Sequence, residues 1–158
     1  MRRRAVFGDM KTFLILSLLA LPLNAEIRGA ARGGVFVGAD QEAVGTIELD
    51  VRRGNWSVAP AYDSIRGGYG LHAIHVDVRR FFKFEHDTVW IGAGPTFVSS
   101  NSGSRTTWNV DAGFAWRTNG VWEPFIAARY YSFRIPVFRD VVEGNGAVIS
   151  IGISRRFH

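Results

Sequence analysis

Hydrophobic and polar side chains alternate with a period of two in two consecutive runs near the C-terminal third of the chain. The first run extends from Trp108 to Trp116 and the second from Trp122 to Tyr130, with Thr118-Asn119-Gly120 between them. Successive residues of a β-strand face opposite sides, and an Asn-Gly pair favours a tight turn. These runs therefore predict a β-hairpin with one apolar face and one polar face.

The apolar face of each predicted strand begins and ends with an aromatic ring, and the two rings lie eight residues apart. At about 3.4 Å per residue this spacing corresponds to roughly 27 Å of strand, or roughly 21 Å of height at a tilt of about 40°. That height is close to the apolar band of about 25 Å of a transmembrane barrel, which aromatic residues edge on both sides. We therefore predict that Trp108, Trp116, Trp122 and Tyr130 form part of a membrane girdle.

Shorter alternating runs, separated by turn residues, occupy most of the remaining chain. With the hairpin they predict an all-β fold, an eight-stranded antiparallel up-and-down transmembrane β-barrel in the bacterial outer membrane. If both termini are periplasmic, the segment from Arg134 to Asn145 is an extracellular loop, and Ser99 to Arg105 is another polar loop. The other predicted strands span residues 27–39, 43–53, 56–65, 69–81, 88–99 and 146–157.

The first 25 residues have the features of a secretory signal peptide. Arginines 2–4 and Lys11 precede a short apolar core, Phe13 to Leu21, and Leu23-Asn24-Ala25 is a suitable cleavage site. The apolar core is shorter than the roughly 20 residues that a transmembrane anchor needs. We therefore expect a signal peptide over 1–25, beginning at Met1 or Met10, and a barrel over 26–158.

A soluble barrel of the lipocalin or avidin type is the main alternative fold, and it would turn its apolar residues inwards.

The net charge argues against a nucleic-acid-binding protein. The chain carries +5, of which +3 lies in the predicted signal peptide, so the barrel is too balanced for nucleic-acid binding. There are no cysteines, and His72 and His75 lie on opposite strand faces, so we expect no metal site and no cofactor.

The polar faces of the predicted strands carry charges of both signs. Side chains alone fill the interior of an eight-stranded barrel, and buried charges must be paired to be tolerated there. We therefore predict a lumen network of ion pairs, with a narrow proton or ion path as the alternative. Its predicted members are Glu48, Asp50, His75, Asp77, Asp111, Arg117, Glu123 and Arg129.

The segment from Ser150 to Phe157 resembles the terminal strand of outer-membrane proteins, in which alternating apolar residues precede a closing aromatic residue. It differs at Arg155, where an apolar residue is usual, and at His158, which follows the aromatic. The chain after the signal peptide resembles the small OmpA-, OmpX- and OmpW-type barrels, including the stretch from Ile91 to Pro95. This resemblance implies a monomer with a structural or surface-interaction role. Its implied partners are outer-membrane lipids, lipopolysaccharide and, through the last strand, the barrel assembly machinery.

A second resemblance implies an enzyme. The stretch from Arg129 to Ser132, followed by a loop and a final strand, is similar to the end of PagL-type lipid A 3-O-deacylases. Those proteins are barrels with a Ser-His-Glu triad, and Ser132 matches the nucleophile. Tyr130 stands where that family has its histidine, and Val148 lies near the position of its glutamate. The alternative function is therefore a lipid A acyl hydrolase with an altered or lost triad.

Overall fold

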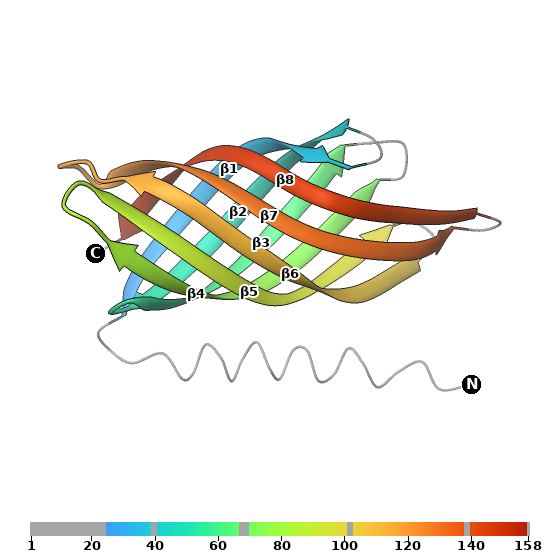
Figure 1. Cartoon of the computed structure of the whole chain (residues 1–158), viewed down its shortest axis with the longest axis horizontal. Helices are drawn as coiled ribbons and strands as arrows, with labels where there is room; N and C mark the ends of the chain where they lie inside the picture. The colour runs from blue at the N-terminus through green and yellow to red at the C-terminus, as the bar shows by residue number, and fades with distance from the viewer. Residues whose placement is uncertain (1–24, 39–40, 67–69, 101–102, 138–139, 158) are drawn as a thin grey trace.

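The chain folds into eight antiparallel strands that close into one barrel, as the computed structural model shows (Figure 1). The structure describes residues 25–38, 41–66, 70–100, 103–137 and 140–157, and within these the side chains of 133–144 are not described. The predicted signal peptide lies outside the described residues except for Ala25. The strands are β1 (Glu26–Val37), β2 (Gln41–Arg53), β3 (Trp56–Arg66), β4 (Leu71–Lys83), β5 (Asp87–Ser100), β6 (Gly103–Trp116), β7 (Trp122–Val137) and β8 (Asp140–Phe157).

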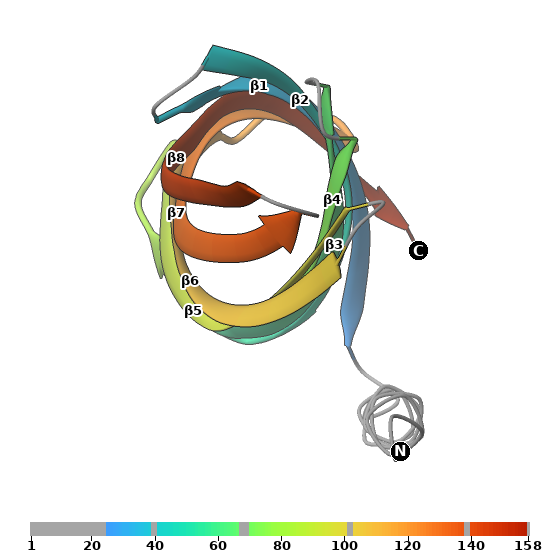
Figure 2. The same ribbon diagram turned by 90° about the vertical axis from the view of Figure 1, so that its right-hand side faces the viewer.

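Each strand pairs with its neighbours in the sequence, and β1 also pairs with β8. The closing register places Ile27 opposite Phe157 and Val37 opposite Ala147. The ring of strands is visible in Figure 2, which looks along the barrel. Closure therefore gives every strand a hydrogen-bonded neighbour on both sides along the body of the barrel. The predicted all-β fold with eight antiparallel strands in a closed barrel is confirmed.

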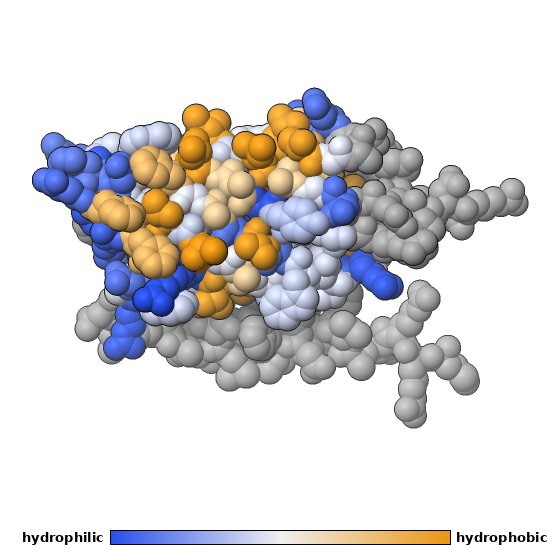
Figure 3. Space-filling model, viewed as in Figure 1, coloured by the Kyte–Doolittle hydropathy of each residue, from blue (hydrophilic) through white to orange (hydrophobic). Residues whose placement is uncertain are grey.

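The apolar faces of the strands point outwards and the polar faces point inwards. In β4, for example, Ile74 and Val78 are 40% and 51% exposed, whereas His75, Asp77 and Arg79 between and beside them are buried. Apolar side chains gather over the middle of the outer wall, with hydrophilic ones towards its ends (Figure 3). A lipocalin-like barrel has the opposite arrangement, so this orientation does not fit the lipocalin or avidin type.

The start of β1 and the end of β8 lie at one end of the barrel, together with three short connections, residues 54–55, 84–86 and 117–121. We call this the terminal end and the opposite one the far end. Gly54 begins the turn between β2 and β3 with a φ of +61°, a left-handed conformation that glycine adopts without strain. Within the described ranges, no helix has the length and apolarity needed to cross a membrane.

The two predicted long loops at the far end were wrong. Most of Ser99 to Arg105 is strand, because β5 continues to Ser100 and β6 begins at Gly103. Most of Arg134 to Asn145 extends the β7–β8 hairpin, in which Arg134 pairs with Glu143. This hairpin projects beyond the other strands (Figure 1). Backbone pairing continues there without alternation of apolar and polar residues, so the sequence pattern does not reveal these ends of the strands.

Candidate functional site: the charged lumen

A cluster of opposite charges fills the middle of the barrel. Arg79 Nη2 donates to Glu48 Oε2 at 2.8 Å, and its Nε lies 2.6 Å from Asp111 Oδ2. Arg129 Nη2 donates to Asp77 Oδ2 at 2.8 Å. All five side chains are at most 5% exposed. We call these five residues, together with the side chains that contact or hydrogen-bond to them, the central cluster.

Arg32 and Asp63 complete the charges of the central cluster. Arg32 lies 3.5 Å from Glu48 and 3.7 Å from Asp111, measured between guanidinium nitrogens and carboxylate oxygens. Asp63 lies 3.4 Å from Arg129. The seven charged side chains come from six different strands, β1, β2, β3, β4, β6 and β7. Barrel closure is therefore what brings them within reach of one another.

Further side chains hydrogen-bond to two of the carboxylates in this cluster, those of Asp63 and Asp77. His75 Nε2 lies 2.9 Å from Asp63 Oδ2, and His75 Nδ1 lies 2.8 Å from Thr96 Oγ1. Thr46 donates its hydroxyl to Asp63 at 2.7 Å, and Asn109 donates its amide to Asp77 at 2.7 Å. Buried charges are tolerated only when hydrogen bonds satisfy them in this way. The central cluster is thus a connected polar network.

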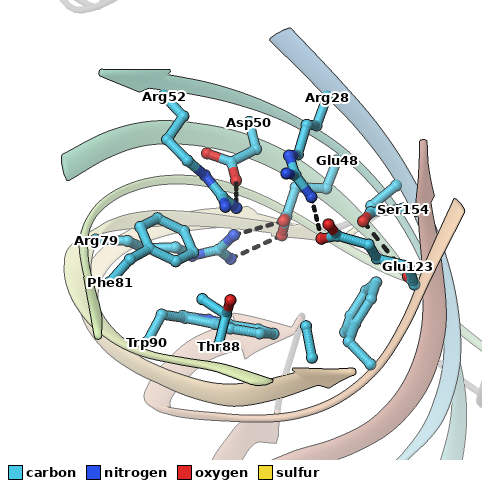
Figure 4. Close-up of a pocket in the computed structure, with 13 residues that line it drawn as sticks. Arg28, Glu48, Asp50, Arg52, Arg79, Phe81, Thr88, Trp90, Glu123 and Ser154 are labelled. Carbon is cyan, nitrogen blue, oxygen red and sulfur yellow. Dashed lines mark hydrogen bonds and ion pairs between the residues drawn. The ribbon is translucent and has the colours of Figure 1, made fainter. Parts of the chain in front are cut away.

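A second set of ion pairs closes the terminal end. Arg28 bonds to both Glu26 and Glu123, and Arg52 donates to Asp50 at 2.7 Å. Around them lies a cavity of about 30 Å³, shown with its lining side chains in Figure 4. A space of this size holds about one water molecule. This terminal cluster therefore gathers charges from β1, β2 and β7 around the cavity.

Apolar side chains complete the filling of the lumen. Phe81, Trp90 and Phe125 pack together beside the charges, and the Trp90 indole N–H donates to Asp111 at 2.9 Å. A separate apolar cluster lies towards the far end, and an ion that moved along the lumen would have to cross it. It consists of Phe36, Val44, Ile65, Leu71, Ala73, Val98, Tyr131 and Val148.

Gly113 makes room for the largest of these rings. A Cβ atom at this position would lie 2.0 Å from Cζ2 of the Trp90 ring. No real contact is that short, so any side chain at position 113 must displace Trp90. The glycine in an otherwise regular strand is therefore explained by the close approach of the indole.

Replacing Gly113 with Ala should destabilise the barrel by about 1–3 kcal/mol, the usual cost of overpacking a filled interior. Gly45→Ala is the matched control, because a Cβ at position 45 meets nothing within 4 Å. Denaturant titration followed by tryptophan fluorescence measures both variants. Equal stability of the two variants would contradict the packing of Trp90 against Gly113.

Seven of the eight charged residues predicted for the lumen are in the two clusters, and Arg117 is not. The seven are Glu48, Asp50, His75, Asp77, Asp111, Glu123 and Arg129. Arg117 is exposed and lies beyond the end of β6, where its backbone N–H donates to the carbonyl of His86 at 2.9 Å. The prediction for Arg117 was wrong because the alternation of faces stops where the strand stops.

Four buried charged residues of the lumen were absent from the predicted set: Arg28, Arg32, Asp63 and Arg79. Arg79 continues the inward face of His75 and Asp77, so alternation could have identified it. The glycines and alanines of β1 hide the alternation around Arg28 and Arg32. Asp63 follows the small inward residues Ala59 and Ala61, which do not distinguish a lumen from a core.

No family model matches the sequence, and no curated protein is significantly similar to it. Solved structures are similar in fold. Neisserial surface protein A (NspA) matches with a TM-score of 0.65 at 13% identity, over 84% of this chain and 97% of that chain. The N-terminal β-barrel domain of Pseudomonas aeruginosa OprF matches with a TM-score of 0.65 at 10% identity, over the same shares. The chain has the fold of small outer-membrane β-barrels.

A third solved structure agrees with this fold. Ail, the attachment invasion locus protein of Yersinia pestis, was solved in complex with the heparin analogue sucrose octasulfate. It matches with a TM-score of 0.58 at 14% identity, over 84% of this chain and 97% of that chain. At such identities the similarity concerns the fold alone.

The four residues predicted for the girdle all lie on the outer wall. Trp116 and Trp122 are 42% and 48% exposed near the terminal end, and Trp108 and Tyr130 are 73% and 51% exposed towards the far end. Other aromatic side chains are exposed near the terminal end: Trp56, Phe82, Phe84 and Phe157.

Ser132, the residue that matches the nucleophile of the deacylases, is exposed on β7 and pairs with Asn145 of β8. The Tyr130 hydroxyl donates to the Asn145 side-chain carbonyl. Within the described part of the chain, Ser132 forms no hydrogen bond to a histidine or a carboxylate. A serine hydroxyl needs such a base to attack an ester.

Proposed function

We propose that this chain is a non-enzymatic outer-membrane protein with a structural or surface-interaction role. The observation that carries this proposal is the orientation of the faces, with an apolar outer wall and a lumen of paired charges. Water cannot stabilise so large an exposed apolar surface, whereas lipid can. The exposed rings near both ends of the wall suit the two interfaces of a bilayer.

We orient the barrel in the membrane by its termini and by its projecting hairpin. We place the terminal end, which holds both ends of the barrel chain, in the periplasm, and the projecting β7–β8 hairpin outside the cell. NspA is by name a surface protein and Ail an attachment protein. A surface-interaction role is proposed here for the projecting β7–β8 hairpin. The partners proposed here are lipopolysaccharide, membrane lipids and, through β8, the barrel assembly machinery. The barrel is proposed to be monomeric.

The lumen supports a structural role rather than transport. An ion on this path would have to separate the pairs around Arg79 and Arg129 and then cross the far-end apolar cluster. Both steps are costly in an interior of low dielectric constant. We therefore assign the charges to holding the barrel together and not to conduction.

The test is refolding of residues 26–158 from urea in three conditions: plain buffer, detergent micelles and lipid vesicles. We expect a folded barrel with heat-modifiable gel migration only in micelles and vesicles, and no ion flux across the vesicles. A folded monomer in plain buffer would overturn the membrane assignment. Stepwise ion currents would overturn the structural role of the lumen.

The hydrolase alternative depends on Ser132, which is exposed on the outer rim of the barrel. Mass spectrometry of lipid A from cells that produce the chain separates the two functions. The non-enzymatic proposal predicts unchanged lipid A. Loss of one ester-linked acyl chain with the natural protein, but not with Ser132→Ala, would establish the hydrolase instead.

A further inference from the structure

Two arginines project from the outer wall near the terminal end, in the same local arrangement. Arg80 of β4 is directly opposite Trp56 of β3, and Arg155 of β8 is directly opposite Trp122 of β7. In both strands a phenylalanine follows two residues later on the same face, at positions 82 and 157. Each arginine therefore has an aromatic ring beside it on its own strand and on the next.

The guanidinium groups lie against these rings. The Arg80 guanidinium carbon is 5.5 Å from the ring centres of both Trp56 and Phe82. The Arg155 guanidinium carbon is 5.2 Å from the Trp122 ring centre and 5.9 Å from that of Phe157. Cation–π contacts at these distances hold a guanidinium in place while leaving its N–H groups available.

Neither guanidinium has a carboxylate partner among the described residues, in contrast to the paired arginines of the lumen. The surroundings are basic as well. Among the described residues of the terminal end, the exposed acidic residue is Glu85. The exposed basic residues there are Arg53, Arg80, Lys83, Arg117 and Arg155. An anion bound by either of these arginines would therefore come from outside the chain.

We propose that Arg80 and Arg155 each bind the phosphate of an anionic phospholipid headgroup in the membrane leaflet at the terminal end. This inference rests on the membrane placement proposed above. A guanidinium that lies on aromatic rings presents its N–H edge for two parallel hydrogen bonds to phosphate oxygens. The rings also locate it at headgroup level, where an arginine is tolerated on a lipid-facing wall.

The two sites are separate. The order of strands in the closed barrel places β4 and β8 on opposite sides of the ring. One lipid cannot reach both arginines, so the barrel should hold two anionic lipids independently. Arg155 departs from the apolar residue usual in a terminal strand, and this lipid contact accounts for that departure.

Native mass spectrometry of the refolded barrel tests the proposal. The protein is released from micelles that contain equal amounts of phosphatidylglycerol and phosphatidylcholine with identical acyl chains. We expect up to two retained phosphatidylglycerol molecules on the natural protein. Arg80→Gln and Arg155→Gln should each reduce this number to one. The double variant should show no preference for phosphatidylglycerol over phosphatidylcholine.

Arg66→Gln is the matched control, because Arg66 is an exposed arginine at the far end. It should keep both phosphatidylglycerol molecules. Arg155→Lys keeps the charge but loses the flat stacking group, so it should retain less lipid than the natural protein. Heat-modifiable migration verifies that each variant is folded, and the two single variants carry the test if the double variant does not fold.

Retention of phosphatidylglycerol by the double variant at the natural level would overturn the proposal. So would equal retention of the two lipids by a natural protein that inserts normally into vesicles. Failure of every form to insert would instead refute the membrane placement itself. The three results are distinguishable because insertion and lipid retention are measured separately.

Discussion

Replacing Arg129 with Met should lower the free energy of unfolding by about 3–5 kcal/mol, the cost of stranding buried charges without their partner. Arg129 is 1% exposed and lies within 4 Å of four carboxylates, those of Glu48, Asp63, Asp77 and Asp111. Methionine removes the charge but keeps an unbranched side chain of comparable length. The loss therefore reports the missing ion pairs more than a missing volume.

Arg117→Met is the control for this experiment, since it makes the same chemical change at an exposed arginine outside the lumen. Its effect should stay within about 0.5 kcal/mol, as for most surface substitutions. Guanidinium titration of both variants in the same micelles measures the difference. If Arg129→Met were as stable as Arg117→Met, water would have to solvate the carboxylates of the central cluster, and the lumen would not be filled.

Replacing Ile126 with Arg should cost about 2–4 kcal/mol in a bilayer, the penalty for a charge on a lipid-facing strand near the midplane. Ile126 is 46% exposed on the outer wall, halfway along β7 between Trp122 and Tyr130. If those rings mark the two interfaces, position 126 faces acyl chains. An arginine there can reach neither headgroups nor water without distorting the bilayer.

Val121→Arg is the matched control, an aliphatic residue 39% exposed in the connection at the terminal end. Its cost should be about 0–1 kcal/mol, as near a membrane interface. Reversible unfolding from vesicles by guanidinium measures both variants. Equal losses of unfolding free energy at positions 121 and 126 would show that the aromatic rings do not mark the depth of the outer wall in the bilayer.

The sequence alone determined the number of strands and the direction in which their faces point. Alternation is a local property, because each side chain of a strand faces opposite to the one before it. The inward position of Asp111 and the outward position of Ile126 could therefore be predicted from their immediate neighbours. The same reasoning was wrong for Arg117, since alternation has no meaning beyond the last paired residue of a strand.

The partners of the buried charges were decided only by the tertiary structure. Arg129 bonds to Asp77, 52 residues away, and lies near Asp63, 66 residues away. Those contacts depend on the register of every strand pair between them and on barrel closure, neither of which alternation encodes. For the same reason, only the folded barrel places Trp90 over Gly113 and sets Arg155 against Trp122.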